Sequence, residues 1–435
     1  MSGGELARKD LVKITAVLNI GTSLEWYDFV VSSTAAAIVW PEIYFSSSNP
    51  ATALLLSFTV FGIGFLSRPI GSILFGHFGD KIGRKSSLVW TLLTMGIGTL
   101  GIGLDPSLSQ IGILAPILLT LFRLLQGLGI GGEWGGAATM LTEFVSTKRF
   151  RGFWVSWIQQ GLQFGVILGN VAFLLLERLP EPVFLSSGWR IAYYIGFVIA
   201  ITAAVLRYKV YETPLFTKLL SKKEISKIPF VDMMKKDWKK VFIMAMIFLE
   251  ASAGFYIAIS FSQAYIKSFL HFNSSFATLA VMIGAIATVF GTMVAAYLSD
   301  VIGSRKKIMI ISPIGVILFS FPFFILMNTR VPSLVILAVA AYYVIELFGW
   351  SVMPTFYAEY TPTKYRYTAT SFAINLATPL SGGLAPIIMT FILQQFNDNY
   401  LIGWPYVALV SVIYGVLGLI GVLLVKEDTA TRALE

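Results

Sequence analysis

Twelve strongly apolar stretches, each long enough for an α-helix to cross a lipid bilayer, fill nearly all of this 435-residue chain. The hydrocarbon core of a membrane is ~30 Å thick and takes about 20 helical residues to span. Only 13% of the residues are charged, which is about half the share found in soluble domains. The sequence therefore predicts an all-α integral membrane protein with twelve transmembrane helices. We place them at residues 13–39, 51–75, 87–104, 111–140, 153–176, 189–207, 241–266, 276–298, 308–327, 333–356, 368–394 and 402–425.

The basic residues indicate how these helices are oriented. Lys and Arg are concentrated in one set of alternate loops and in both termini. The opposite loops hold only Arg178, Arg190, Lys267 and Arg330. Because cytoplasmic loops carry an excess of Lys and Arg, both termini are expected on the cytoplasmic side of the plasma (inner) membrane. The net charge of +9 then reflects topology and contact with the bilayer, and nucleic-acid binding is not predicted.

Composition also excludes several kinds of chemistry. The chain has no cysteine, so disulfides, thiol catalysis and thiolate metal sites are excluded. Its two histidines, His77 and His271, are predicted on opposite sides of the membrane, so neither a metal centre nor another cofactor is expected. No HExxH or GxSxG motif is present, and the sequence is therefore not predicted to be an enzyme.

The helices divide six and six around the longest polar stretch. This division predicts an N-terminal bundle at 1–207, a cytoplasmic linker at 208–240 and a C-terminal bundle at 241–435. The two halves echo each other, because Asp80 and Gly83 recur as Asp300 and Gly303 with the same internal spacing. Pseudo-symmetric six-helix bundles that rock about a central site are the architecture of many secondary transporters.

A second echo lies after the fourth helix of each half. Glu143 and Arg151 in the first half are matched by Glu359 and Arg366 in the second. The echo is incomplete after the second helix, because Ser304 stands where the first half has Arg84. The sequence therefore supports a latch less strongly in the second copy of this loop than in the first.

Charged residues inside the predicted helices indicate where the function lies, since a charge at mid-membrane costs roughly 2.5–3.5 kcal/mol on insertion scales. Glu25 and Asp28 are spaced i and i+3 in the first helix, and at least one of them is expected to hold a proton. We predict that both serve proton coupling, with Glu250 of the seventh helix assisting. The alternative is that they are structural partners of arginines on other helices.

Two arginines are predicted inside helices, and each offers a planar fork that suits a carboxylate. Arg123 is the first candidate for binding a carboxylate substrate, and Arg68 the second. Glu133 and Glu346 bring the intramembrane acids to five, so some acids are expected to be neutral for part of a transport cycle.

Several polar side chains are further candidates for contacts with substrate. Gln159 and Gln163 of the fifth helix and Asn375 of the eleventh can bind hydroxyl or carbonyl groups. They serve equally well as hydrogen-bonding links between helices.

The motifs together resemble a known family. The loop Gly76-x-x-Gly79-Asp80-Lys81-x-Gly83-Arg84-Lys85 is similar to the signature loop of the major facilitator superfamily. Within it, the chain resembles the metabolite:H⁺ symporter branch, whose members carry α-ketoglutarate, citrate, shikimate, and proline or betaine. The segments that carry this resemblance are Leu24-Glu-Trp-Tyr-Asp-Phe29, Phe65-Leu-Ser-Arg-Pro-Ile-Gly71, Arg123-Leu-Leu-Gln-Gly127, Gly131-Gly-Glu-Trp-Gly-Gly136, Gly188-Trp-Arg190 and Glu212-Thr-Pro-Leu-Phe216.

The resemblance implies a major facilitator fold and a conformational latch on the cytoplasmic side. In that superfamily the residues corresponding to Asp80 and Arg84 hold the outward-open state, and Gly83 permits the turn between them. We predict gating roles for Asp80, Gly83, Arg84, Glu143, Arg151, Asp300 and Glu346.

We therefore expect a proton-coupled secondary transporter, a symporter that imports a small organic acid or related metabolite by alternating access. Its ligands would be a small molecule with a carboxylate and the coupling proton, and the family resemblance implies a monomer. The alternatives are a symporter of a zwitterionic or neutral solute, such as proline, betaine or a sugar, and a proton-independent uniporter.

Overall fold

The computed structural model describes residues 8–45, 50–396, 400–426 and 428–434, and within these ranges all regular structure is helical. The helices are α1 (Arg8–Ile38), α2 (Trp40–Tyr44), α3 (Pro50–Lys81), α4 (Arg84–Leu104), α5 (Leu108–Ile111), α6 (Leu114–Phe144), α7 (Arg151–Leu176), α8 (Glu181–Val183), α9 (Arg190–Tyr208), α10 (Pro214–Ser221), α11 (Pro229–Tyr256), α12 (Ser262–Ser268), α13 (Ser274–Ile302), α14 (Arg305–Met309), α15 (Ile311–Asn328), α16 (Pro332–Trp350), α17 (Met353–Tyr360), α18 (Arg366–Thr378), α19 (Leu384–Gln395) and α20 (Tyr400–Leu424). Short π-helical turns join α8 to α9, α11 to α12 and α18 to α19, so each of these pairs runs as one continuous rod.

Eleven helical segments in the described part of the chain are long and apolar enough to cross a membrane. The first helix, α1, is less apolar because it carries Glu25 and Asp28, but its 31 residues pack along the membrane-spanning α7. The structure thus confirms an all-α membrane protein.

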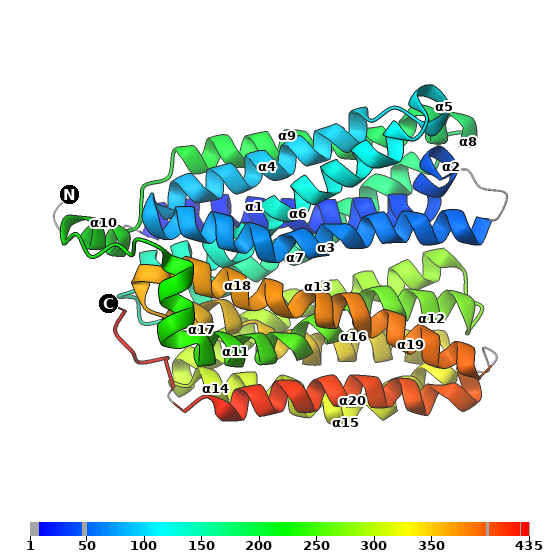
Figure 1. The fold of residues 1–435 in the computed structure, drawn as a ribbon. Coiled ribbons are helices and arrows are strands. Elements are labelled where there is room, and N and C mark those ends of the chain that lie inside the picture. The colour runs from blue at the N-terminus through cyan, green and yellow to red at the C-terminus, as the bar shows by residue number, and fades with distance from the viewer. Residues whose placement is uncertain (1–7, 46–49, 397–399, 427, 435) are drawn as a thin grey trace.

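The rods form two bundles that lie side by side (Figure 1). One bundle contains α1, α3, α4, α6, α7 and α9, and the other contains the helices from α11 to α20. Across the boundary, α3 and α6 pack against α18, and α7 packs against α13. Both termini and α10 lie at the same end of the molecule, whereas α2, α5 and α8 lie at the opposite end.

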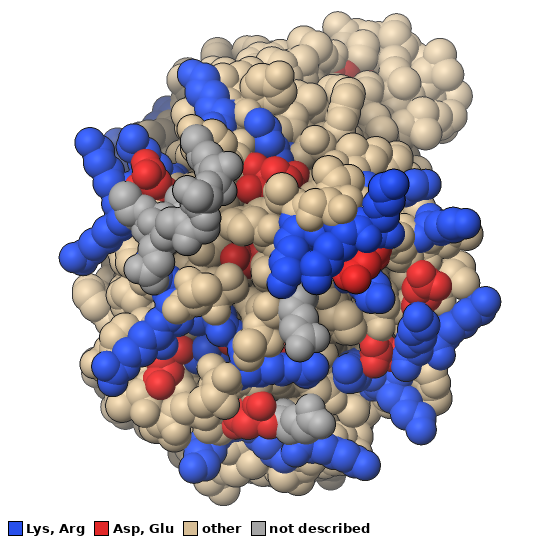
Figure 2. Space-filling view, turned by 90° about the vertical axis from the view of Figure 1, so that its left-hand side faces the viewer, with Lys and Arg blue, Asp and Glu red and all other residues tan. Residues whose placement is uncertain are grey.

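The end that holds the termini is strongly basic. Figure 2 shows this face, on which Lys and Arg side chains cluster around scattered acidic groups. We call it the basic face. It contains the loop between α3 and α4, the segment around α10 and the loop before α14, as the distribution of Lys and Arg along the chain predicted.

The segment between the bundles is more helical than the sequence suggested. Residues 208–240 contain α10 and the first turns of α11, which begins at Pro229 and bends at Asp237. Proline suits the first turn of a helix, and Met233 of this turn is fully buried. The predicted membrane span begins at residue 241 because the residues before it are charged. The helix itself begins earlier, at Pro229.

Glycine allows α3 and α6 to pack backbone against backbone. A Cβ placed on Gly71 of α3 would lie 2.0 Å from the carbonyl oxygen of Leu128, while a Cβ on Gly62 of the same helix would meet nothing within 4 Å. The close approach therefore depends on the missing side chain at position 71.

We predict that Gly71→Ala lowers the melting temperature of the purified protein, because overpacking of this kind costs roughly 1–3 kcal/mol. Gly62→Ala is the matched control and should leave the melting temperature equal or higher, since alanine is the better helix former. Equal melting curves for the two variants would contradict the packing argument.

Candidate functional site

Asp28 lies at the centre of a hydrogen-bonded network inside the N-terminal bundle. Its carboxylate accepts from the Thr99 hydroxyl at 2.5 Å and from the Gln126 amide at 3.3 Å. The same Gln126 side chain accepts a bond of 2.6 Å from the guanidinium of Arg123. Asp28 and its second carboxylate oxygen are fully buried, and that oxygen has no hydrogen-bond partner. The predicted proton carrier and the predicted substrate arginine are thus linked through one amide.

Glu25 interacts with a different arginine. Although it lies one turn before Asp28, the cation that acts on it is Arg68 of α3. One Glu25 oxygen and the Arg68 Nε are buried without a hydrogen-bond partner. The two acids of α1 therefore form two acid–arginine sets, Glu25 with Arg68 and Asp28 with Arg123.

The count of intramembrane arginines needs a correction. The sequence prediction placed only Arg68 and Arg123 inside helices, but Arg207 in the last turn of α9 is also buried. It binds Glu133 through two hydrogen bonds, of 2.5 and 2.7 Å. Position 207 stood at the predicted boundary of the linker, and its basic character alone placed it outside the membrane. Glu133 is consequently ion-paired and structural.

Aromatic rings fill the boundary between the bundles beside these sets. Trp26 of α1 contacts Phe255 of α11 at a centroid distance of 4.7 Å, and Phe29 contacts Tyr256 at 5.3 Å. The guanidinium of Arg68 lies 4.5 Å from the ring centre of Phe65 in the same layer. The polar atoms in this layer that are buried without a hydrogen-bond partner are Trp26 Nε1, Ser252 Oγ, Tyr256 Oη and Trp350 Nε1.

Such a concentration of unsatisfied polar groups requires an explanation, because buried polar groups are nearly always paired in native structures. Each of these atoms is a hydrogen-bonding group available to a solute that binds in this layer. The layer lies between the bundles, where rocking would expose it alternately to each side.

The predicted polar contacts fall into two groups. Gln159 accepts from Trp134 at 3.0 Å and donates to the Trp350 carbonyl at 3.1 Å, so it links the bundles. Asn375 donates both amide hydrogens, to the carbonyls of Gly131 and Ser371, each at 2.8 Å. The Gln163 amide nitrogen, by contrast, has no partner. Of the three, Gln163 retains a donor for a solute.

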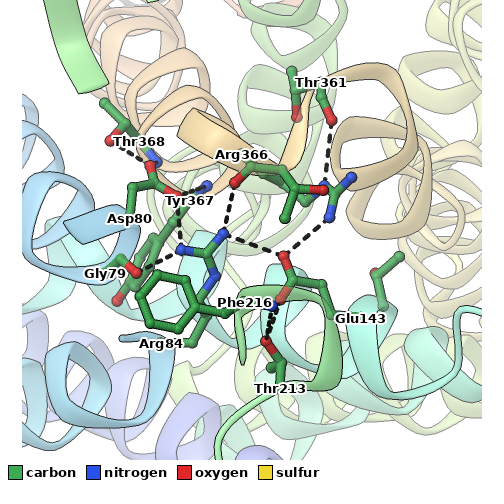
Figure 3. A network of polar contacts seen from close by, with 12 residues as sticks. Gly79, Asp80, Arg84, Glu143, Thr213, Phe216, Thr361, Arg366, Tyr367 and Thr368 are labelled. Carbon is green, nitrogen blue, oxygen red and sulfur yellow. Dashed lines mark hydrogen bonds and ion pairs between the residues drawn. The ribbon is translucent and has the colours of Figure 1, made fainter. Parts of the chain in front are cut away.

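At the basic face, Asp80 and Arg84 form the centre of a buried network of polar contacts (Figure 3). We call this network the gate, after the gating role that the sequence predicts for it. Asp80 accepts from the backbone N–H groups of Tyr367 and Thr368, at 3.2 and 2.8 Å, and thus caps α18 of the other bundle. Arg84 lies 3.0 Å from Asp80. The backbone φ of +140° at Gly83, just before Arg84, is one that favours glycine.

Glu143 completes this gate. Its carboxylate accepts from Arg84 at 3.3 Å and from Arg366 of the opposite bundle at 3.0 Å. All three side chains are almost completely buried. A carboxylate of one bundle is therefore held by an arginine of the other (Figure 3).

The second copy repeats this arrangement with the bundles exchanged, and it is not the weaker one. Asp300 accepts from the N–H groups of Gly152 and Phe153, at 2.9 and 2.8 Å, and caps α7. Arg305 lies 2.6 Å from Asp300 and pairs with it as Arg84 pairs with Asp80. The sequence comparison had set Ser304 against Arg84 and so found no arginine at this place. Because α14 starts one residue later than the repeat suggests, the arginine is shifted by one position.

Arg151 and Glu359 mirror the crossing pair of the first copy. Arg151 of the N-terminal bundle lies 2.8 Å from Glu359 of the C-terminal bundle, which Arg305 also contacts at 3.2 Å. Together the two copies close the basic face with ion pairs that cross between the bundles. Sequence analysis noted Glu359 and Arg366 as an echo but did not assign them to the gate.

Two straps that sequence reasoning missed cover these pairs. The first strap is the segment after α9, where Thr213 donates to Glu143, and Glu212 accepts from the backbone N–H of Lys85 at 3.2 Å. The second strap is the segment after α20, where Thr429 donates to Glu359 at 2.6 Å, and Asp428 accepts from the N–H of Arg305 at 2.9 Å. The same number of residues separates Glu212 from Asp428 as Glu143 from Glu359, and this spacing was the available signal.

Comparison with known proteins supports this description along the whole chain. Residues 14–237 match the family model described as "Sugar (and other) transporter", and residues 243–435 match that of the "Major Facilitator Superfamily". The chain is 37% identical to the inner membrane metabolite transport protein YhjE of Escherichia coli (strain K12), over 88% of each chain.

Two further relatives have names that state what they carry. The glycine betaine/proline/ectoine/pipecolic acid transporter OusA of Dickeya dadantii (strain 3937) is 30% identical, over 98% of this chain and 85% of its own. The shikimate transporter of Escherichia coli (strain K12) is 30% identical, over 94% and 93%.

Among solved structures, the proton:xylose symporter XylE bound to 6-bromo-6-deoxy-D-glucose superimposes with a TM-score of 0.76 over 95% of both chains, at 19% sequence identity. This likeness confirms the predicted fold of two six-helix bundles.

The gate yields a test by cysteine labelling, which has no background because the chain contains no cysteine. Ser371 of α18 is buried against Gly135 of α6 across the boundary. We predict that Glu143→Gln raises the rate at which a maleimide labels S371C by roughly tenfold, the effect of ~1.4 kcal/mol of bias toward opening.

A cysteine at the exposed Ser221 of α10 is the control and should react equally with and without Glu143→Gln. If S371C also reacts at one rate in both backgrounds, the Glu143 pairs do not hold this face closed.

Proposed function

This chain belongs to the major facilitator superfamily, and we propose that it is a proton-coupled symporter that imports a small organic acid or related metabolite by alternating access. It is a multi-pass inner membrane transporter and not an enzyme. The proposal concerns the coupling ion, the class of substrate and the orientation of the chain.

The link between Asp28 and Arg123 carries the proton-coupling part of the proposal. Gln126 binds both side chains, so the charge on Asp28 influences how firmly Arg123 is held. When Asp28 takes up a proton, it stops attracting the arginine, whose guanidinium is then available to a substrate anion. When the anion leaves, Arg123 again favours the ionised form of Asp28, and the proton is released.

Glu25 and Arg68 form the second set in this scheme. Both reach toward the aromatic layer between the bundles, where the unpartnered polar atoms lie. A carboxylate bound by the guanidinium of Arg68 or Arg123 gains charge-assisted hydrogen bonds in a low-dielectric setting. Shikimate, which a relative carries, is such an acid.

A zwitterionic substrate is the second candidate, and the aromatic layer favours it. Rings such as Trp26, Phe255 and Tyr256 are suited to an ammonium group, while an arginine holds the carboxylate. Another relative carries glycine betaine and proline, which have both groups. The transport assay below distinguishes the two classes of substrate.

The proposed orientation places the basic face in the cytoplasm. Positive residues favour that side, and both termini lie at this face. The crossing ion pairs then close the transporter toward the cytoplasm. Substrate and proton would enter from the other side, and breaking these pairs would release them inward.

The test is proton movement into liposomes that contain the purified protein and a trapped pH dye. Citrate, α-ketoglutarate, lactate, shikimate, betaine and a sugar are added in turn. We expect one carboxylate to acidify the lumen and Asp28→Asn to abolish the acidification, because the amide cannot exchange a proton. Entry of labelled solute without acidification would indicate a uniporter and overturn the proposed coupling.

The substrate part has its own variant. We expect Arg123→Ala to reduce uptake of the active carboxylate by at least about tenfold, the effect of losing one charge-assisted contact. Arg178→Ala is the matched control, since Arg178 is exposed outside the membrane spans, and it should transport normally. Full uptake by Arg123→Ala would exclude Arg123 as the anion-binding group.

A further inference from the structure

Two carboxyl groups meet inside the C-terminal bundle. Glu250 of α11 and Glu346 of α16 have exposed fractions of 1% and 0%. The Glu346 carboxyl group lies against α11 at Gly254, one turn after Glu250, and the Ser312 hydroxyl contacts both residues. Sequence analysis gave them separate roles, in coupling and in gating, but the structure brings them together.

The pair lacks hydrogen-bond donors. Ser312 of α15 lies 3.1 Å from one Glu250 oxygen, but its single hydroxyl hydrogen is shared with the Glu346 backbone carbonyl at 2.7 Å. Neither carboxyl oxygen of Glu346 has a donor. Two ionised carboxylates can only accept hydrogen bonds, so one of them must be protonated to supply the missing donor.

Nearby titratable groups do not relieve this shortage. Tyr342 and Tyr357 act electrostatically on the pair, but the Tyr342 hydroxyl bonds to Ser411 at 2.7 Å and the Tyr357 hydroxyl donates to the Met244 carbonyl at 2.7 Å. None of the ion pairs in the part of the chain that the structure describes includes either carboxyl group. The packed faces of α15 and α20 contribute a serine and a glycine.

The first half of the chain shows what is missing. There Thr91 donates to Glu133 at 2.8 Å, and Arg207 neutralises that carboxylate. The same number of residues separates Thr91 from Ser312 as Arg84 from Arg305, so the two hydroxyl groups occupy equivalent places in the two halves. The hydroxyl is retained in the second half, but there α20, the equivalent of α9, contributes Gly418 and no cation, and a second acid comes from α11.

The surroundings are shaped to hold both carboxyl groups. A Cβ on Gly254 of α11 would lie 1.9 Å from a Glu346 oxygen, and one on Gly418 of α20 would lie 2.4 Å from the Glu250 Cβ. The requirement for glycine is strict at Gly418, because the atom that a side chain would meet there is the Glu250 Cβ. The residues that contact the two carboxyl groups, Gly254, Ser312 and Gly418, all belong to the C-terminal bundle.

We propose that Glu250 and Glu346 form a proton-binding site in the C-terminal bundle, where a resident proton is shared between the two carboxyl groups. This proton serves the second bundle as Arg207 serves the first, by preventing adjacent uncompensated charges in the membrane. Because the residues in contact with the pair all belong to the C-terminal bundle, its proton stays bound through the transport cycle and is distinct from the coupled one. The inference stands independently of the proposed symport.

The direct test is an infrared difference spectrum between the wild type and the double variant Glu250→Gln/Glu346→Gln at pH 8. We expect the wild type to show the C=O absorption of a protonated carboxyl group, shifted in heavy water, that the double variant lacks. The single variants provide the same comparison if the double variant does not fold. A difference spectrum with only carboxylate bands would overturn the proposal.

Stability provides the second readout. At neutral pH the folded protein holds this proton, whereas the glutamates of the unfolded chain have already lost theirs. The free energy of unfolding therefore falls as the pH rises. Between pH 6 and pH 9 the melting temperature of the wild type should fall by roughly 2–4 °C more than that of the double variant. Burial raises the pKa of Asp105 to about 7 and also raises that of Glu212, but both groups are present in every variant and cancel in the comparison. Equal pH dependence would contradict the shared proton.

The claim that the proton is resident is tested by the ratio of protons to substrate in the liposome assay. Glu346→Gln should keep the wild-type ratio, whatever its rate. A lower ratio would show that this proton moves with the substrate.

Discussion

Each buried charge in this protein must be compensated within the membrane, and the rest of the structure depends on how this is done. A carboxylate or guanidinium that is buried within the membrane without a partner is costly. Glu133 is compensated by Arg207, and Asp28 by hydrogen bonds that lead to Arg123. Glu250 lies beside Ser312, and no ion pair in the described part of the chain includes it. The buried acids are therefore compensated in different ways.

At the basic face the compensating charge comes from the other bundle. Glu143 is held by Arg366, and Glu359 by Arg151, so each half is incomplete without its partner. Such pairs are strong while the bundles stay together and are lost when the bundles separate at this face. An arrangement of this kind has two discrete states, which is what alternating access requires. The segments after α9 and α20 donate hydrogen bonds to the same two carboxylates.

Sequence reasoning reached the fold and several members of the polar network at the basic face, because both are recorded in local patterns. Apolar runs marked the membrane spans, and the Asp80 loop marked the turn. It failed where a residue's role depended on distant partners. Arg207 looked like a linker cation, and Ser304 looked like a lost arginine, although Arg305 fills that place. Asn375 links α18 to α6, which is one of the two roles that the sequence allowed.

The sequence by itself determined that the chain is a helical membrane protein of two repeated halves with charges inside the membrane, because hydropathy and repeat spacing are properties of neighbouring residues. Only the tertiary structure decided which charges meet. Glu25 and Asp28 are one turn apart yet act with different arginines, and Glu250 meets Glu346 from another helix. Charge pairing depends on distances of a few ångströms between helices, and these are set by packing across the whole bundle.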